Sequence, residues 1–134
     1  MATMIFVNLP VKDLDKSKDF FTKLGYSFNP QFTDGNAACL VISDTIFAML
    51  LTEEHFSTFT KKQIADTATH QETLIGLSAD SRQAVDELAD RALAAGATAA
   101  GDAVELEGMY GRSFFDLDGH HWEVTWIDPA TAQA

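Results

Sequence analysis

Two side chains near the carboxyl end of the chain have the types and the spacing to do chemistry together. His121 and Glu123 stand two residues apart in the segment HWEVTW, directly after the turn signal Asp118–Gly119. An Asp-Gly pair between aromatic and β-branched residues predicts a hairpin, with strands over Arg112–Leu117 and His121–Ile127. Alternate residues of a strand share a face, so we expect His121 and Glu123 on one face and both tryptophans on the other.

A carboxylate beside an imidazole can serve as a general acid or base, as a ligand anchor, or as a metal ligand. The same pair is also common as an ion pair without any function in a half-buried sheet. Glu123 is therefore the first candidate catalytic residue and His121 the second. The neighbouring His120 points the other way along the strand, and we expect it in the turn, bonded to the turn backbone.

The composition limits the classes of partner. Nine Lys and Arg against twenty Asp and Glu give the chain a net charge of −11, which argues against nucleic acid and anionic membranes as partners. The sequence has no apolar run of membrane-spanning length and no leader pattern, which predicts a cytoplasmic protein. The single cysteine, Cys39, rules out an internal disulfide and is expected to be buried.

The order of predicted elements occurs twice, which indicates an internal duplication within one domain, 1–134. In module one, residues 1–52, a strand, a helix and three strands are expected at Met4–Val11, Asp15–Leu24, Tyr26–Phe32, Ala37–Ile42 and Thr45–Leu51. In module two, residues 72–128, the same order is expected at Glu72–Ala79, Ser81–Ala95, Ala97–Ala100 and the two hairpin strands, with Val104–Gly111 as a loop. Residues 53–71 form a linker with a short helix around Glu53–Ile64, and residues 129–134 form a frayed tail.

Two motifs carry a resemblance to a known family. The stretch LPVKDLDKSKDFFTKLGY near the start and the stretch FFDLDGHHWEV near the end are similar to the opening and closing motifs of the vicinal oxygen chelate superfamily, the glyoxalase, bleomycin-resistance and extradiol dioxygenase group. The resemblance implies an α+β fold in which two tandem βαβββ modules form a U-shaped eight-stranded mixed sheet around a cavity. It also implies a homodimer and, in the enzymes, one divalent metal ion held by the first and last strands of each module.

The resemblance places the four metal-ligand positions of the family at Phe6, Met49, Leu74 and Glu123. Three of these side chains are apolar and offer no useful donor to a divalent ion. Asn8 shares a face with Phe6 and is at best a weak ligand. We therefore expect a degenerate metal site, with Glu123 as the metal ligand if any ion binds.

Phe6 and the other cavity-facing residues become candidate ligand-binding residues. They are Phe6, Asn8, Phe47, Met49, Leu74, Tyr110 and Arg112, the last two at the cavity mouth unless Arg112 simply pairs with Asp116. Phe56 and Phe59 of the linker either cap this cavity or pack the linker onto the sheet.

The leading hypothesis is a protein that binds a small apolar or aromatic molecule without a metal or another cofactor. The alternative is a divalent-metal-dependent lyase or dioxygenase, similar to lactoylglutathione lyase, that uses Glu123 with His121, Asn8 or a residue of a partner chain. A third hypothesis is an interaction protein whose cavity is packed shut. The sequence does not name the ligand.

Overall fold

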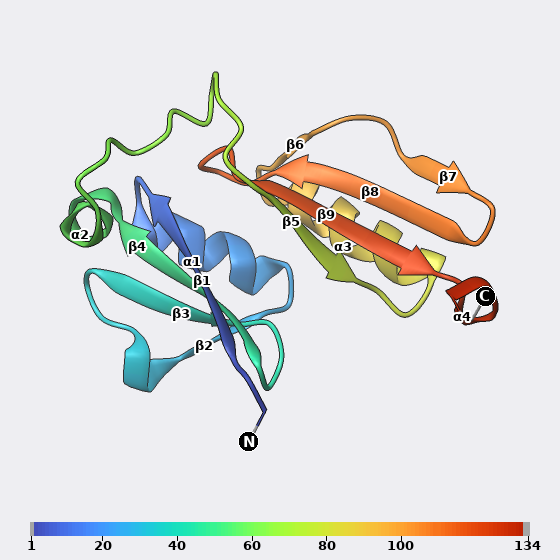
Figure 1. Cartoon of the computed structure of the whole chain (residues 1–134), viewed down its shortest axis with the longest axis horizontal. Helices are drawn as coiled ribbons and strands as arrows, with labels where there is room; N and C mark the ends of the chain where they lie inside the picture. Colours follow the sequence, from blue (N-terminus) through green and yellow to red (C-terminus); the bar gives the residue numbers. More distant parts are fainter. Residues whose placement is uncertain (1, 133–134) are drawn as a thin grey trace. The chain divides into compact units, whose positions relative to one another are not determined.

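The computed structural model describes residues 2–132, and the chain divides into two compact units, Met1–Asp66 and Thr67–Ala134. Each unit contains one β-sheet with a helix against it (Figure 1). Of the predicted tail, residues 133–134 lie outside the described part of the chain.

The first unit follows the predicted order of a strand, a helix and three strands. Its elements are β1 (Ile5–Val11), α1 (Leu14–Lys23), β2 (Ser27–Asn29), the 3-10 helix η1 (Pro30–Phe32), β3 (Ala37–Val41), β4 (Ile46–Thr52), α2 (Glu53–Phe56) and the 3-10 helix η2 (Ser57–Phe59). The sheet order is β1-β4-β3-β2, with β1 parallel to β4 and the other pairs antiparallel.

Local signals at both ends fix the position of α1. The Asp13 carboxylate accepts a hydrogen bond from the Lys16 amide, as an N-cap should, and Gly25 follows the helix with a φ of 105°. The buried Phe20 and Phe21 of α1 supply much of the core of this unit, and the helix packs on β3 and β4. The opposite face of the sheet is therefore not covered by α1.

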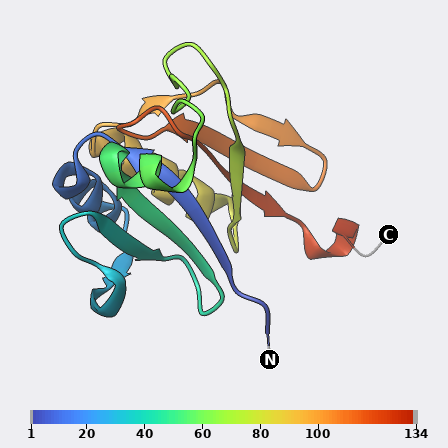
Figure 2. The same ribbon diagram turned by 60° about the vertical axis from the view of Figure 1, so that its left-hand side comes forward.

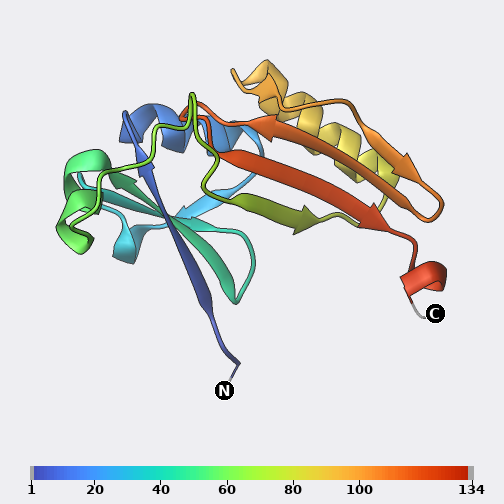
Figure 3. The same ribbon diagram turned by 45° about the horizontal axis from the view of Figure 1, so that its top comes forward.

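The second unit repeats the arrangement with α3 on one face of its sheet (Figure 3). Its elements are β5 (Leu74–Ser78), α3 (Arg82–Ala94), β6 (Thr98–Ala99), β7 (Val104–Leu106), β8 (Met109–Phe115), β9 (His121–Ile127) and α4 (Pro129–Ala132). The order is β5-β9-β8-β6, and β7 also pairs with β8. Val85 and Ala89 of α3 are buried with Phe114, Trp122 and Val124 of the sheet.

The α+β class and the two βαβββ-like modules are confirmed, but the strands form sheets of four and five rather than eight strands in one. The ninth strand arises because β6 and β7 are two parts of one strand beside β8. From Ala99 to Val104 the chain advances five positions, whereas their partners on β8, Phe114 and Gly111, are only three positions apart. The interruption is therefore a bulge with two extra residues. The prediction of a loop over Val104–Gly111 was therefore wrong.

Three other boundaries differ from the sequence prediction. The expected strand over Tyr26–Phe32 ends at Asn29, because Pro30 opens η1 and the Asn29 side chain caps it. The expected linker helix ends at Phe56 and continues as η2. Pro129 starts the short helix α4 within the predicted tail. Cys39 is buried as predicted, and within residues 2–132 no helix has the length and apolar character to cross a bilayer.

Candidate functional site

The turn between β8 and β9 is built around the carboxylate of Asp116. Its Oδ1 accepts hydrogen bonds from the amides of Asp118 and His120 at 2.9 and 3.0 Å, and its Oδ2 accepts one from the Trp122 indole at 2.9 Å. Burial raises the pKa of Asp116, although the His120 charge and these hydrogen bonds act in the opposite direction. This role of Asp116 was not predicted from the sequence. The available signal was its carboxylate, which stands two residues before the Asp118–Gly119 turn.

His120 is buried beside this turn, and its imidazole contacts a carboxylate from outside the turn. Its Nδ1 lies 3.1 Å from Oε1 of Glu72, just before β5. Thr67 approaches the same turn, and its hydroxyl donates a hydrogen bond to the Asp118 carbonyl oxygen. Both contacts fasten the segment before β5 to the β8–β9 turn, so His120 has a structural role within the second unit.

His121 and Glu123 share a face of β9, as predicted, and their side chains meet. Nε2 of His121 lies 3.5 Å from Oε1 of Glu123, and the Phe115 ring packs edge-on against the imidazole at a centroid distance of 5.2 Å. Leu74 of β5 is the register partner of His121, so it lies on the expected face. The Glu123 side chain is 43% exposed, whereas that of His121 is 14% exposed.

Small residues surround Glu123 and leave room above it. Its register partners are Gly76 on β5 and Ser113 on β8. The resulting pocket measures about 110 Å³ and is lined by Asp102, Val104, Met109, Gly111, Arg112, Ser113, Glu123 and Thr125. This volume is below the range of about 300–1,000 Å³ that is usual for ligand pockets, so it suits a few water molecules rather than an organic ligand.

The donors on this face do not fit the divalent ion that the family resemblance implies. A catalytic site of that kind uses three or more protein ligands, whereas His121 and Glu123 supply two. In the part of the chain that the structure describes, no group of three or more His, Cys, Asp or Glu side chains is placed to hold a metal ion. We therefore derive no metal-assisted chemistry from this pair.

The side chains of Tyr110 and Arg112 extend toward α3, although Arg112 also lines the Glu123 pocket. The Tyr110 hydroxyl donates to Oδ1 of Asp86 on α3 at 2.6 Å, and Arg112 donates to Asp86 and Asp90 at 3.1 and 2.9 Å. The Tyr110 hydrogen bond, followed by Arg112, lowers the pKa of Asp86. Even-numbered residues of β8 face α3, so these side chains anchor the helix, and Asp116 is not the partner of Arg112.

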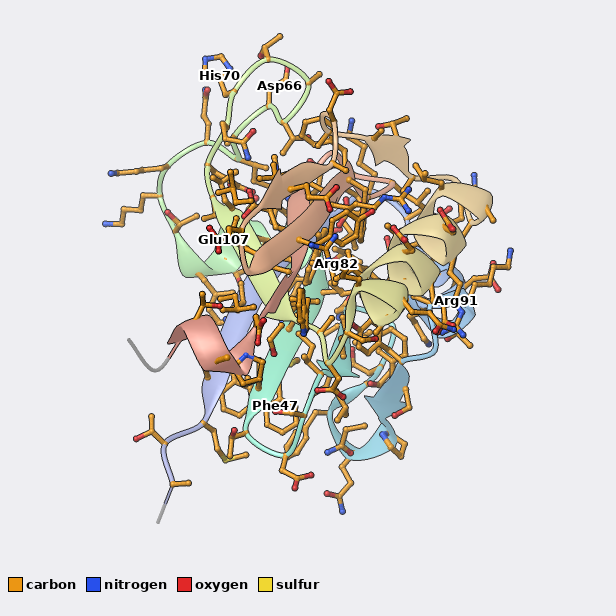
Figure 4. The ribbon with its side chains drawn as sticks, turned by 90° about the vertical axis from the view of Figure 1, so that its right-hand side faces the viewer. Phe47, Asp66, His70, Arg82, Arg91 and Glu107 are labelled. Atoms are coloured by element: carbon orange, nitrogen blue, oxygen red, sulfur yellow. The ribbon has the colours of Figure 1, made fainter. Side chains whose placement is uncertain are left out.

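The same side of the sheet holds a second basic group. The guanidinium of Arg82, labelled in Figure 4, lies 5.3 Å from the Tyr110 ring centroid and 5.4 Å from that of Trp126. Arg82 also forms an ion pair with Glu105 of β7. Trp126 thus faces away from Glu123, and its indole packs beneath the Arg82 side chain of α3.

In the first unit, four predicted ligand-binding residues share one face of the sheet. Phe6 pairs with Phe47, and Asn8 pairs with Met49, across the parallel β1–β4 ladder. The Phe6 and Phe47 rings stack with centroids 5.1 Å apart and an interplanar angle of 13°. This face lies opposite the one that packs on α1.

A cavity near these residues lies where α2 and η2 cover the end of β1 and β4. Figure 2 shows α2 beside this end of the two strands. The pocket measures about 410 Å³ and is lined by Asn8, Leu51, Phe56, Phe59 and Thr60. The His55 ring packs edge-on against Phe59 at 5.2 Å. The structure thus brings Asn8 together with the linker aromatics, whereas Phe6, Phe47 and Met49 lie outside the lining.

Comparisons with known proteins agree with this fold. Residues 3–43 match the family described as bleomycin resistance protein-like N-terminal. A hypothetical protein of S. aureus has a similar structure, with a TM-score of 0.80, 29% identity and 95% of each chain covered. The chain has no match among curated protein sequences.

Two further solved structures connect the fold to named families. A glyoxalase/bleomycin resistance protein/dioxygenase family enzyme from Burkholderia phytofirmans gives a TM-score of 0.77 at 18% identity, covering 94% of this chain and 99% of the other. A mutant of the fosfomycin resistance protein FosX from Listeria monocytogenes, complexed with Mn(II), gives 0.67 at 19% identity, covering 92% and 89%. The fold and the N-terminal match are consistent with the vicinal oxygen chelate superfamily, which includes the glyoxalase, bleomycin-resistance and dioxygenase proteins.

Proposed function

We propose that this chain binds a small, flat, apolar or aromatic molecule in the pocket of the first unit, without a metal ion. The observation that carries the proposal is the lining of that pocket: two phenylalanines and a leucine surround about 410 Å³, with one amide and one hydroxyl among them. Ligand pockets in proteins have this size and this mostly apolar lining with few polar groups.

The side chains at the inferred metal positions agree with binding rather than metal chemistry. Phe6, Met49 and Leu74 occupy three of the four positions that the family resemblance assigns to ligands. The N-terminal match to the bleomycin resistance protein-like family points to the same class of protein. We therefore propose that the metal site of the superfamily is degenerate in this chain.

The proposal is tested with the neutral fluorescent probe N-phenyl-1-naphthylamine and two matched variants. Phe59→Ala removes a ring that lines the pocket, whereas Phe32→Ala removes another exposed ring, at the end of η1 and away from the lining. Loss of one aromatic contact of about 1–1.5 kcal/mol corresponds to roughly tenfold weaker binding. We expect that loss in Phe59→Ala and wild-type binding in Phe32→Ala; equal binding by all three proteins would rule out this pocket.

The second candidate function is a divalent-metal-dependent lyase or dioxygenase reaction at Glu123. The contact between His121 and Glu123 favours it, because the two side chains present adjacent donors on one face. Elemental analysis of the purified protein after exposure to Mn(II) or Zn(II) separates the candidates. One tightly held ion per chain that is lost in Glu123→Gln would overturn the metal-free proposal, and the His70→Gln variant, altered in the linker, is the control.

The remaining expectations from the sequence stay predictions. A homodimer is testable by sedimentation of the purified chain, and a cytoplasmic location by fractionation of the source cells. That the two units act together as one domain, 1–134, predicts that they unfold in a single transition.

A further inference from the structure

We propose that the pocket of the first unit selects aromatic molecules that carry an N–H or O–H donor at one edge, and that the amide oxygen of Asn8 accepts this hydrogen bond. The inference rests on the proposed function, because it describes the chemistry of the molecule bound in the same pocket.

The Asn8 side chain is oriented by its own strand. Its Nδ2 donates a hydrogen bond to the Phe6 carbonyl oxygen at 3.2 Å. The flipped amide would place two acceptor oxygens against each other, so the Phe6 carbonyl selects the orientation that turns Nδ2 toward the backbone. Within residues 2–132, no donor bonds to Oδ1 of Asn8, and this residue lines the pocket. Asn8 therefore presents an acceptor to a bound molecule.

The rest of the lining gives this acceptor its selectivity. Leu51, Phe56 and Phe59 are apolar and cannot donate to Oδ1. The Thr60 hydroxyl oxygen already accepts a hydrogen bond from the Lys62 amide at 3.1 Å, which leaves its proton for an acceptor on the ligand. A ligand without a donor would displace water from Oδ1 and leave it unpaired against an apolar ring, which weakens binding.

The test compares two molecules of the same shape that differ in this donor. Indole carries a ring N–H, whereas benzofuran carries an oxygen at that position. Both compete against N-phenyl-1-naphthylamine on the full chain. We expect indole to displace the probe at about five- to tenfold lower concentration than benzofuran, the ratio expected for one net hydrogen bond.

Two substitutions of Asn8 separate recognition from packing. Asn8→Leu removes the acceptor and should bring the indole-to-benzofuran ratio close to one. Asn8→Asp also supplies an acceptor and should preserve the preference for indole, although its second oxygen cannot donate to the Phe6 carbonyl as Nδ2 does. If Asn8 only shaped the pocket, both competitors would weaken together in Asn8→Leu and the ratio would not change.

The outcomes distinguish this inference from the proposed function. Equal displacement by indole and benzofuran in the wild-type chain, with probe binding still lost in Phe59→Ala, would overturn the role of Asn8 and leave the binding pocket in place. If the probe shows no binding that depends on Phe59, the proposed function fails, and the selectivity inferred from Asn8 fails with it.

Discussion

Replacing Asp116 with Asn tests the physical account of the β8–β9 turn. The substitution preserves the shape of the side chain and keeps an oxygen for the amides of Asp118 and His120. It replaces the second oxygen with an NH₂ group, which then faces the indole N–H of Trp122, 2.9 Å away in the wild-type turn. Two donors cannot bond to each other, so one hydrogen bond is lost and a buried donor is left without a partner.

The magnitude follows from these contacts. Loss of a hydrogen bond to a charged acceptor costs about 1.5–3 kcal/mol, and an unsatisfied buried donor costs roughly 1–3 kcal/mol. Removal of the charge offsets part of this cost, because burial already disfavours the Asp116 carboxylate and raises its pKa. We expect a net loss of about 2 kcal/mol in the free energy of unfolding at pH 7, or a Tm lower by roughly 8 °C.

The pH dependence provides an independent check of the same residue. A folded-state pKa above the unfolded value means that the folded chain binds more protons in the window between them. The stability contributed by Asp116 is therefore complete below about pH 3.9, the unfolded pKa, and is lost as the pH rises through the folded pKa. The stability difference between wild type and Asp116→Asn should accordingly shrink from pH 4 to pH 7, as measured by urea unfolding.

Two controls make the result decisive. Asp80→Asn removes one exposed carboxylate and should leave the free energy of unfolding within about 0.5 kcal/mol of wild type. Trp122→Phe combined with Asp116→Asn removes the donor that the amide faces, so the double variant should be more stable than the sum of the single effects predicts. Strict additivity, or a stability difference that widens as the pH rises, would refute the assigned role of the Asp116–Trp122 hydrogen bond.

Other predictions concern the helix anchor and the tight turn. Asp86→Asn should destabilise the chain at neutral pH, and the difference in free energy of unfolding from wild type should shrink as the pH falls toward 3, because the Tyr110 and Arg112 hydrogen bonds lower the folded pKa of Asp86. Urea unfolding at pH 3 and pH 7 measures this difference, and a value that is the same at both pH values would contradict the role of these hydrogen bonds. Gly119→Ala should lower the free energy of unfolding by about 2 kcal/mol, because φ is 79° and an added Cβ would lie 2.5 Å from the Thr67 hydroxyl oxygen. Adding Thr67→Ala relieves the contact but not the backbone strain, so thermal unfolding should show partial recovery in the double variant.

The elements that the sequence predicted well are those with local signals. Asp13 and Ser81 cap the two long helices, and Gly25 and Gly96 follow them with positive φ, because a helix end is decided by residues within one turn of it. The hairpin at Gly119 is predictable for the same reason. The bulge between β6 and β7 carries no comparable signal, since it depends on how many residues each strand uses before pairing resumes.

The candidate site was predictable only in part. Strand alternation places His121 with Glu123, and Phe6 with Asn8, on shared faces without knowledge of the partner strands. Alternation also separates Arg112 from Glu123, but the carboxylates that Arg112 contacts lie on α3, more than twenty residues away in the sequence. Such a partner is fixed by the position of the helix on the sheet, which no local pattern encodes.

The sequence by itself determined the duplicated order of elements, the turn that presents Glu123, and the apolar character of the positions where the family resemblance places metal ligands. Only the tertiary structure decided which cavity these residues line. It gave Glu123 a small pocket, directed the side chains of Tyr110 and Arg112 toward α3, and placed Asn8 with Phe56 and Phe59 around one pocket. The physical reason is that composition and periodicity set the face of each side chain, whereas the volume above that face depends on elements that are distant in sequence and pack against it.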